Sequence, residues 1–177
     1  MADPAALPLA ASLIAADALE EQLKIQCQVK WPNDLIWNGK KLGGILCESV
    51  QGAILCGIGI NLMQDEVYFT QNNLPNGISA AQILGRTPEM ETAGKLALAM
   101  SERYADEMDA FFQQGFPAVR DEYRKRCANL GRQVWFEGGS GQAVDVDENG
   151  RLVVNTNEGK QAVFTGEVTV KGIYGNK

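Results

Sequence analysis

Two short segments of this chain carry side chains that are well suited to binding anions. The first is Lys30-Trp31-Pro32-Asn33-Asp34, and the second, which follows closely, is Lys41-Leu42-Gly43-Gly44. Together they place two lysines, a carboxylate and a carboxamide on one predicted strand, turn and hairpin. Such a set suits a site that holds a carboxylate and a phosphate side by side, because ammonium groups reduce the repulsion between two anions.

Two segments alternate between apolar and other residues, as strands with one buried face do. Residues 25–31 predict one such strand, with Lys30 on its polar side. Residues 53–62 predict the other, with Gly57 and Gly59 at alternate positions on one side. Glycines on one face of a strand indicate that another group approaches the backbone closely there.

The dipeptide Asn38-Gly39 lies between short apolar runs and predicts a hairpin with a two-residue turn. In the register that this turn sets, Ile36 pairs with Lys41. Asp34 then pairs with Gly43. We therefore expect Asp34 and Lys41 to lie on the same face of one ribbon.

The rest of the chain predicts helices followed by short strands. The expected helices cover residues 8–23, 79–84, a long stretch opened by Thr87-Pro88-Glu89 and ended by Gly115, and 117–127, with a loop over 64–77. The expected strands cover residues 133–136, 142–146, 152–154, 161–164 and 168–170. Short strands separated by Gly, Asn and Asp clusters are typical of a small antiparallel barrel.

Length and composition limit the class of protein. A chain of 177 residues holds one medium domain, or a medium domain with a small appendix. The net charge of −6 argues against nucleic acid as a partner. No apolar run approaches the roughly 20 residues that span a bilayer, and residues 1–13 contain Asp3 but no basic residue, unlike a secretory signal. We expect a cytoplasmic chain without a membrane partner.

The chain contains no histidine, which excludes Ser-His-Asp and Cys-His catalysis within it. Its four cysteines show no CxxC spacing, and we expect buried reduced thiols rather than disulfides or a zinc site. Any chemistry must therefore rest on lysines, carboxylates, amides, backbone groups and bound ions.

The block from Lys30-Trp31-Pro32-Asn33-Asp34 to Lys41-Leu42-Gly43-Gly44-Ile45-Leu46 closely resembles the centre of the biotin protein ligases (biotin–[acetyl-CoA-carboxylase] ligases). The strand ending Gly57-Ile58-Gly59-Ile60-Asn61-Leu62 strengthens the resemblance, because the two blocks occur in the right order. The resemblance implies an α+β fold. Residues 1–127 would be part of a mixed-sheet, biotin/lipoate ligase-like catalytic domain, and residues 128–177 a small SH3-like β-barrel.

By this resemblance, the intact enzyme uses ATP and magnesium to join the biotin carboxylate to AMP, with loss of pyrophosphate. It then transfers biotin to a lysine of a biotin carboxyl carrier protein. The resemblance implies that Lys41 contacts the biotin carboxylate and the phosphate, that Lys30 lines the adenylate pocket, and that Asp34 orients or helps deprotonate the incoming amine. These three residues are the expected catalytic group.

The resemblance also implies two binding sets. The expected biotin-binding residues are Lys41, Gly43, Gly44, Leu46, Gly57, Gly59 and Ile60, and the expected nucleotide-binding residues are Lys30, Asn33, Asn61 and Lys171. A purely structural interpretation stays open for each: a surface lysine beside a turn, ordinary turn residues, bulge glycines or an edge-strand charge. No metal ligand is assigned.

The family carries an upstream Gly-Arg-Gly-Arg-x-Gly-Arg-x-Trp loop, which this sequence lacks, since its first arginine is Arg86. We therefore expect a truncated ligase that forms adenylate poorly and self-associates, as a homodimer or otherwise, through a sheet edge left exposed beside residues 25–31. The alternative is a non-catalytic binding or assembly module that uses the open edge and the barrel. A biotin-sensing repressor would need an N-terminal helix-turn-helix, and none precedes Pro8; a lipoate-type ligase fits the two motifs less well.

Overall fold

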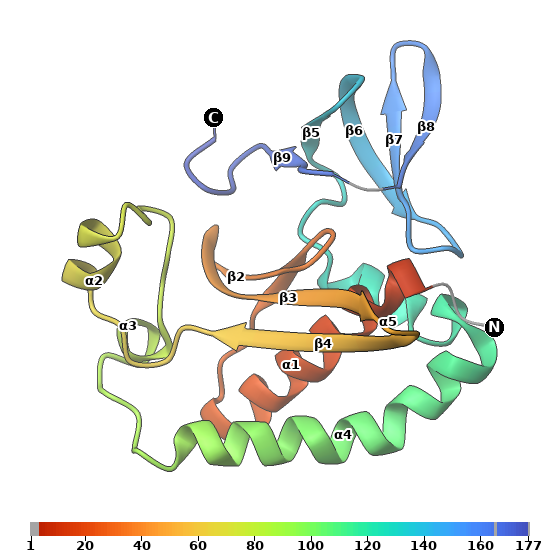
Figure 1. Ribbon diagram of the computed structural model, residues 1–177. Helices are drawn as coiled ribbons and strands as arrows, with labels where there is room; N and C mark the ends of the chain where they lie inside the picture. The colour runs from red at the N-terminus through yellow and green to blue at the C-terminus, as the bar shows by residue number, and fades with distance from the viewer. Residues whose placement is uncertain (1–3, 165, 177) are drawn as a thin grey trace.

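The computed structural model describes residues 4–164 and 166–176 of the chain. They form two antiparallel sheets, with helices gathered against the first (Figure 1). The strand order is β1-β2-β3-β4 in the first sheet and β8-β7-β6-β5-β9 in the second. The α+β class is confirmed, but the first sheet is antiparallel rather than mixed. Its parallel contacts are isolated bridges.

The element bounds follow the sequence pattern closely in most places. The helices are η1 (Pro4–Ala6), α1 (Leu7–Leu23), α2 (Glu66–Gln71), α3 (Ala80–Leu84), α4 (Thr92–Gln114), η2 (Phe116–Ala118) and α5 (Arg120–Arg126). The strands are β1 (Gln28–Lys30), β2 (Asp34–Trp37), β3 (Lys40–Val50), β4 (Ala53–Ile60), β5 (Gln133–Phe136), β6 (Gly139–Val146), β7 (Leu152–Thr156), β8 (Gly159–Val163) and β9 (Thr169–Val170).

Helix α1 is buried on most sides because it lies between the first sheet and α4 (Figure 1). It ends at Leu23 and is followed by Lys24, whose backbone is left-handed (φ 57°); Ile25 N then donates to Leu19 O at 3.3 Å. The chain enters the sheet only at Gln28, so the strand expected over residues 25–31 is shorter than predicted. The pairing between β1 and β2 stops at Gln28, which lies opposite Ile36.

Three other boundaries differ from expectation, each for a local reason. The predicted loop 64–77 contains α2, whose first turn is capped by Asp65 Oδ1 accepting from Tyr68 N at 2.7 Å. Helix α4 begins at Thr92 instead of near Thr87, because the segment between them is irregular. The helix predicted over 117–127 is divided into η2 and α5 at Val119.

The hairpin between β2 and β3 turns at Asn38 and Gly39, both with positive φ, as predicted. Ile36 pairs with Lys41, also as predicted, but Asp34 pairs with Gly44 rather than Gly43. The register shifts by a β-bulge that leaves one extra residue on β3. The predicted register is therefore wrong beyond this point.

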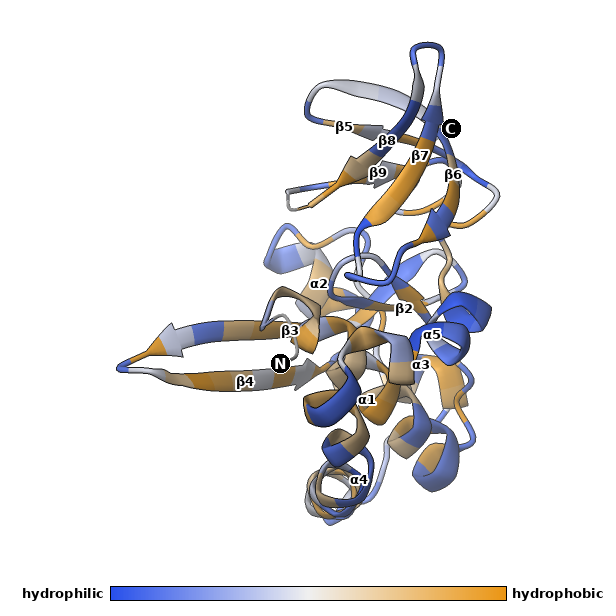
Figure 2. Cartoon of the chain, turned by 90° about the vertical axis from the view of Figure 1, so that its right-hand side faces the viewer, coloured by the Kyte–Doolittle hydropathy of each residue, from blue (hydrophilic) through white to orange (hydrophobic). Residues whose placement is uncertain are grey.

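Strands β3 and β4 continue past the body of the molecule as a projecting hairpin (Figure 2). One face of this pair packs on α1, and the opposite face is open to solvent. The open face carries Leu46 and Leu55, which are 61% and 59% exposed. Within the described ranges, β4 pairs only with β3, so its outer edge is free.

The edge expected to be exposed beside residues 25–31 is covered instead. Ala128 N donates to Val29 O at 2.8 Å, and Asn129 Oδ1 accepts from Trp31 N at 2.8 Å. These bonds join the chain after α5 to the outer side of β1. The expected exposed edge at β1 is therefore wrong, and the free edge belongs to β4.

All five strands expected after residue 128 are present, with shifted ends. They form an open antiparallel sheet: β8 and β9 lie at opposite edges, and no pairing in the described part of the chain joins them into a closed barrel. The shortness of β9, with two residues, limits how far it can pair. Trp31 Nε1 donates to Gly150 O at 2.9 Å and thereby ties this sheet to the first.

Cysteines are free thiols in this fold. Cys27 and Cys127 are buried, and Cys47 and Cys56 are half-buried opposite one another on β3 and β4. Burial raises the pKa of Cys27 and Cys127 to about 11 and that of Cys47 to about 12. Cys27, Cys47 and Cys127 therefore stay protonated near neutral pH. Of the helices in the described ranges, none is long and apolar enough to cross a membrane.

The close approach of β3 and β4 at Gly43 gives a test of the packing. A Cβ at Gly43 would collide with the carbonyl oxygen of Gly59 and lie 2.9 Å from Ile60 Cδ1. We predict that Gly43→Ala lowers the free energy of unfolding by about 1–3 kcal/mol. Gly94→Ala on α4 is the matched control, because no atom lies near its Cβ, and it should stabilise by about 0.5–1 kcal/mol. Urea denaturation measures both, and equal effects would contradict the packing.

Candidate functional site

The carboxylate of Asp34 collects three side chains from separate parts of the chain. Its Oδ1 lies 2.5 Å from Lys41 Nζ, and its Oδ2 lies 3.8 Å from Lys30 Nζ. The Oδ2 atom also accepts a hydrogen bond from Tyr174 Oη at 2.7 Å. The ion pair between Asp34 and Lys41 confirms the prediction that the two residues share a face. Lys30 joins them because antiparallel pairing sets it opposite Asp34.

The two lysines differ in their access to solvent. The side chain of Lys30 is 7% exposed and that of Lys41 47%. Lys30 is not a solvated strand lysine, which was its purely structural interpretation, because the C-terminal segment covers it: Lys30 Nζ lies 5.2 Å from the centre of the Tyr174 ring. Burial lowers the pKa of Lys30, and the nearby carboxylate of Asp34 opposes that shift.

A cavity of about 370 Å³ opens beside Lys41, at the end of β3 away from the β3–β4 turn. Its lining residues are Lys41, Asn61, Phe69, Asn73, Leu74, Pro75, Asn76, Gly77 and Tyr174. The backbone of Lys41 fixes this wall, since Lys41 N donates to Asn76 O at 2.7 Å and Lys41 O accepts from Ile78 N at 2.9 Å. Asn61 Nδ2 donates to Lys41 O at 3.2 Å. We call this cavity the Lys41 pocket.

The open face of β3 and β4 leads into the same region. Gly44 pairs with Gly59 and Leu46 pairs with Gly57, so these residues lie on one face. A Cβ on Gly44 would lie 3.4 Å from both Asp34 Oδ1 and Lys41 Cε. The glycines therefore leave a flat strip of backbone that reaches the Asp34–Lys41 ion pair.

Two members of the predicted biotin-binding set lie elsewhere. Gly43 pairs with Ile60, and this pair lies on the opposite face, toward α1. The predicted set therefore divides between the two faces of the sheet. The structure brings Lys41, Gly44, Leu46, Gly57 and Gly59 together and leaves Gly43 and Ile60 behind them.

The lining of the Lys41 pocket excludes three members of the predicted nucleotide-binding set, namely Lys30, Asn33 and Lys171. Asn33 Nδ2 donates to Ile45 O at 2.8 Å and so fastens the turn before β2 onto β3. Lys171 is exposed and follows β9, where its backbone O accepts from Arg132 Nη1 at 3.1 Å. Asn61 is the member of this set that lines the pocket together with Lys41.

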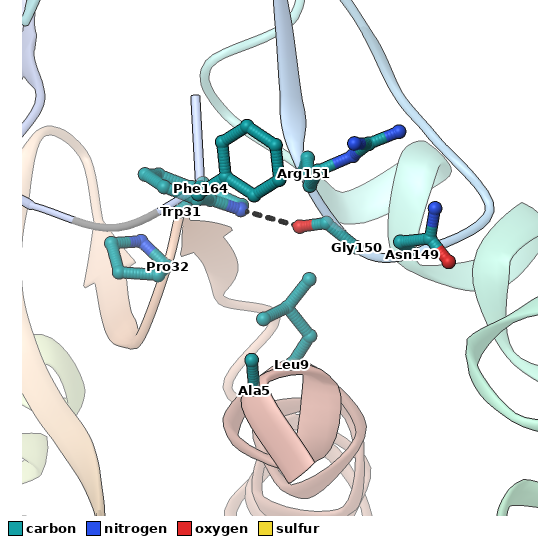
Figure 3. Close-up of a pocket in the computed structure, with 8 residues that line it drawn as sticks. All are labelled: Ala5, Leu9, Trp31, Pro32, Asn149, Gly150, Arg151 and Phe164. Atoms are coloured by element: carbon teal, nitrogen blue, oxygen red, sulfur yellow. Dashed lines mark hydrogen bonds between the residues drawn. The ribbon is translucent and has the colours of Figure 1, made fainter. Parts of the chain in front are cut away.

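A second cavity, also about 370 Å³, lies at the joint between the two sheets (Figure 3). Its lining residues are Ala5, Leu9, Trp31, Pro32, Asn149, Gly150, Arg151 and Phe164. Figure 3 shows the indole of Trp31 directed at Gly150, and Arg151 Cζ lies 4.8 Å from the centre of the Phe164 ring. None of the predicted site residues lines this cavity. It lies beside the hydrogen bond that joins the two sheets.

Comparison with known proteins places this geometry in a family. The sequence matches the Biotin/lipoate A/B protein ligase family over residues 3–65 and the Biotin protein ligase C terminal domain over residues 130–171. The first match contains Asp34 together with Lys30 and Lys41, the two lysines that pair with its carboxylate. The chain therefore combines a segment similar to the Biotin/lipoate A/B protein ligase family with one similar to the Biotin protein ligase C terminal domain.

Individual relatives agree with the family matches. The Bifunctional ligase/repressor BirA of Bacillus subtilis (strain 168) is 29% identical over 174 residues, which cover 92% of this chain and 52% of that protein. The Biotin--[acetyl-CoA-carboxylase] ligase of Paracoccus denitrificans is 28% identical, covering 91% and 72%. The biotin protein ligase from Aquifex aeolicus in complex with biotin and ATP is 28% identical, with a TM-score of 0.78 over 93% of this chain and 70% of that one.

These figures confirm the resemblance inferred from the motifs. They also show that the chain spans about half the length of the BirA relative. Every member of the ligase family compared here aligns with more than nine-tenths of this chain. The similarity therefore extends through both sheets.

Sequence reasoning missed part of the site. Phe69, Asn76 and Tyr174 line the Lys41 pocket, and none was predicted. The segment Asn73-Leu74-Pro75-Asn76-Gly77 before Ile78 indicates a turn but no chemistry. Tyr174 carries no sequence signal at all, because a single tyrosine near a C-terminus is unremarkable until folding brings it to Asp34.

The different exposure of the two lysines predicts unequal effects of breaking their ion pairs. Asp34→Asn removes the charge opposite buried Lys30 and should lower the free energy of unfolding by about 3 kcal/mol. Lys41→Met breaks only the exposed pair and should cost about 1 kcal/mol or less. Chemical denaturation of both variants provides the comparison. Similar losses in the two would argue against a buried counter-ion role for Asp34.

Proposed function

We propose that this chain is part of a biotin protein ligase, which activates biotin with ATP as biotinoyl-AMP and transfers it to a lysine of a carboxyl carrier protein. The observation that carries the proposal is the position of Lys41. Its ammonium lies where the flat glycine strip meets the Lys41 pocket, with Asp34 behind it. Two ligands could meet there, one on the open face and one in the pocket.

Biotin suits the open face of β3 and β4. It is a bicyclic and mostly apolar molecule with one ureido group, and it needs flat contact with a few hydrogen bonds. Gly57 and Gly59 leave the backbone accessible, since a Cβ at either would meet no side chain within 4 Å. Leu46 lies opposite Gly57 on the same face, is 61% exposed and supplies apolar contact. The biotin carboxylate would then point along β3 toward Lys41.

ATP suits the Lys41 pocket. Asn61 and Asn76 offer polar groups, and Phe69 and Leu74 offer apolar ones. Lys41 would contact both the biotin carboxylate and the phosphate that the carboxylate attacks. Its positive charge would reduce the repulsion between the two anions and stabilise the charge that gathers as pyrophosphate leaves.

Transfer requires a lysine amine to attack the acyl carbon of biotinoyl-AMP, with AMP as the leaving group. Asp34 is the carboxylate closest to that point, and we assign it to orienting the amine and accepting its proton. Lys30 would hold the negative charge of Asp34 in place from the buried side. The carrier protein and its lysine are part of this proposal.

Magnesium enters the proposal as the companion of ATP. The described residues contain no group of three or more His, Cys, Asp or Glu side chains that could hold a metal ion. Magnesium commonly uses one or two carboxylates together with nucleotide phosphates. Asp34 would be a minor ligand beside the phosphates, because Lys41 and Tyr174 already engage its oxygens. When bound, the ion would neutralise phosphate charge.

Domain limits and location complete the proposal. We assign residues 1–127 to the partial catalytic domain and 128–177 to the C-terminal β domain, in keeping with the two sheets and the two family matches. We place the chain in the cytoplasm, where ATP and carrier proteins occur. The alternative, a non-catalytic assembly module, is less well supported, because the relatives compared here are named as ligases. The expected impairment of the isolated chain stays a prediction.

The proposed function predicts that the chain binds a non-hydrolysable sulfamoyl analogue of biotinoyl-AMP. Lys41→Ala should weaken this binding roughly 10- to 100-fold, because a hydrogen bond to a charged group contributes about 1.5–3 kcal/mol. Isothermal titration calorimetry measures the affinity of both proteins. Lys40→Ala is the matched control, since Lys40 is the neighbouring exposed lysine and makes no ion pair with Asp34.

The result is decisive in either direction. Binding that depends on Lys41 and not on Lys40 supports the ligase site residue by residue. A folded wild-type chain that produces no heat with the analogue would refute ligand binding by this chain and favour the assembly module.

Self-association is the remaining part of the proposal. The free edge of β4 carries no charged residue from Ala53 to Ile60, and such an edge pairs readily with another strand. We predict a concentration-dependent dimer that Ile54→Lys weakens, because an edge lysine opposes strand pairing. Leu98→Lys on α4, at a site that is also exposed, should leave the dimer intact. Sedimentation velocity measures the dimer fraction of both variants. Equal dimer fractions would rule out the β4 edge as the contact between copies.

A further inference from the structure

We propose that Tyr174 is a positioning residue of the ligase site: it fixes the carboxylate of Asp34 and thereby holds Lys41 at the mouth of the Lys41 pocket. The inference rests on the proposed function and extends it to a residue outside both family matches, the second of which ends at residue 171. Its starting point is the hydrogen bond from Tyr174 Oη to Asp34 Oδ2, at 2.7 Å.

The segment that carries Tyr174 is hydrogen-bonded to the β2–β3 turn. Tyr174 N donates to Gly39 O at 2.9 Å, and Gly172 N closes the segment by donating to Asn176 O at 2.6 Å. Ile173 is buried, with 1% of its surface exposed. The turn accommodates the segment because Gly39 has no side chain: a Cβ there would lie 3.0 Å from Gly172 O. The phenol therefore reaches Asp34 from a fixed base.

The hydrogen bond from Tyr174 gives the two carboxylate oxygens of Asp34 different partners. A carboxylate turns easily about its last torsion, so its oxygens are interchangeable unless a partner distinguishes them. Tyr174 engages Oδ2, and Oδ1 is then directed at Lys41 Nζ. An ion pair to a half-exposed lysine is weak by itself. Lys41 is therefore held in place only as well as the orientation of Asp34 is held.

A tyrosine suits this task better than another cation would. Burial, and next the charge of Asp34, raise the pKa of the Tyr174 phenol well above its ordinary value. The phenol thus keeps its proton and stays a donor throughout the working range of pH. Because it is neutral, it orders Asp34 without cancelling the negative charge that holds the two lysines.

The ring and the hydroxyl of Tyr174 can be separated experimentally. The ring lines the Lys41 pocket and covers Lys30, whose Nζ lies 5.2 Å from its centre. Tyr174→Phe retains both contacts and removes only the donor to Asp34. Any effect of this variant on ligand binding therefore reports on the hydroxyl.

The test is a double-mutant cycle read by calorimetry with the sulfamoyl analogue of biotinoyl-AMP. The four proteins are the wild-type chain, Tyr174→Phe, Lys41→Ala and the double variant. We expect Tyr174→Phe to weaken binding about tenfold, the scale of one hydrogen bond to a charged group. In the Lys41→Ala background the same change should weaken it less than about twofold, because coupled residues are not additive.

Tyr104→Phe is the matched control, since Tyr104 lies on α4, which α1 separates from the first sheet. It should leave the affinity unchanged, and thermal unfolding confirms that each variant is folded. Unaltered binding by Tyr174→Phe would overturn the positioning role while Lys41→Ala still upholds the proposed function. Fully additive losses would also overturn it, because they indicate a general structural contribution. Failure of the wild-type chain to bind would overturn both proposals together.

Discussion

The order of the site depends on one carboxylate. Lys30 is buried, and a buried ammonium is costly unless an opposite charge lies close to it. Asp34 meets this need across the turn between β1 and β2, and the same carboxylate also reaches Lys41 and the phenol of Tyr174. Since the three donors converge on two oxygens, the orientation of the Asp34 carboxylate determines the position of the Lys41 ammonium.

The sheet then separates structural from functional surfaces. Side chains alternate across a strand, so Gly43 and Ile60 pack toward α1 while Gly44, Gly57 and Gly59 line the open face. The bulge in the β2–β3 pairing is what aligns this open face with the ion pair, because it brings Gly44 opposite Asp34. A regular register would have put Gly43 there and reversed the faces.

The C-terminal sheet contributes to the site through contacts made far along the chain. Trp31 is tied to Asn129 and Gly150, which fixes the second sheet beside the turn that carries Asp34. From that position the last segment brings Tyr174 to a residue 140 positions earlier in the sequence. The family's C-terminal domain is therefore connected to the lysine cluster by hydrogen bonds, in addition to the covalent link through α5.

Local spacing by itself determined much of this protein. The apolar period of α1, the Asn38-Gly39 turn, the five C-terminal strands and the sharing of a face by Asp34 and Lys41 all follow from interactions between residues near in sequence. The bulge, the burial of Lys30, the open rather than closed second sheet and the arrival of Tyr174 were decided by tertiary structure. The burial of Lys30 and the arrival of Tyr174 depend on which distant segment covers a given surface, and neither periodicity nor turn chemistry encodes that choice.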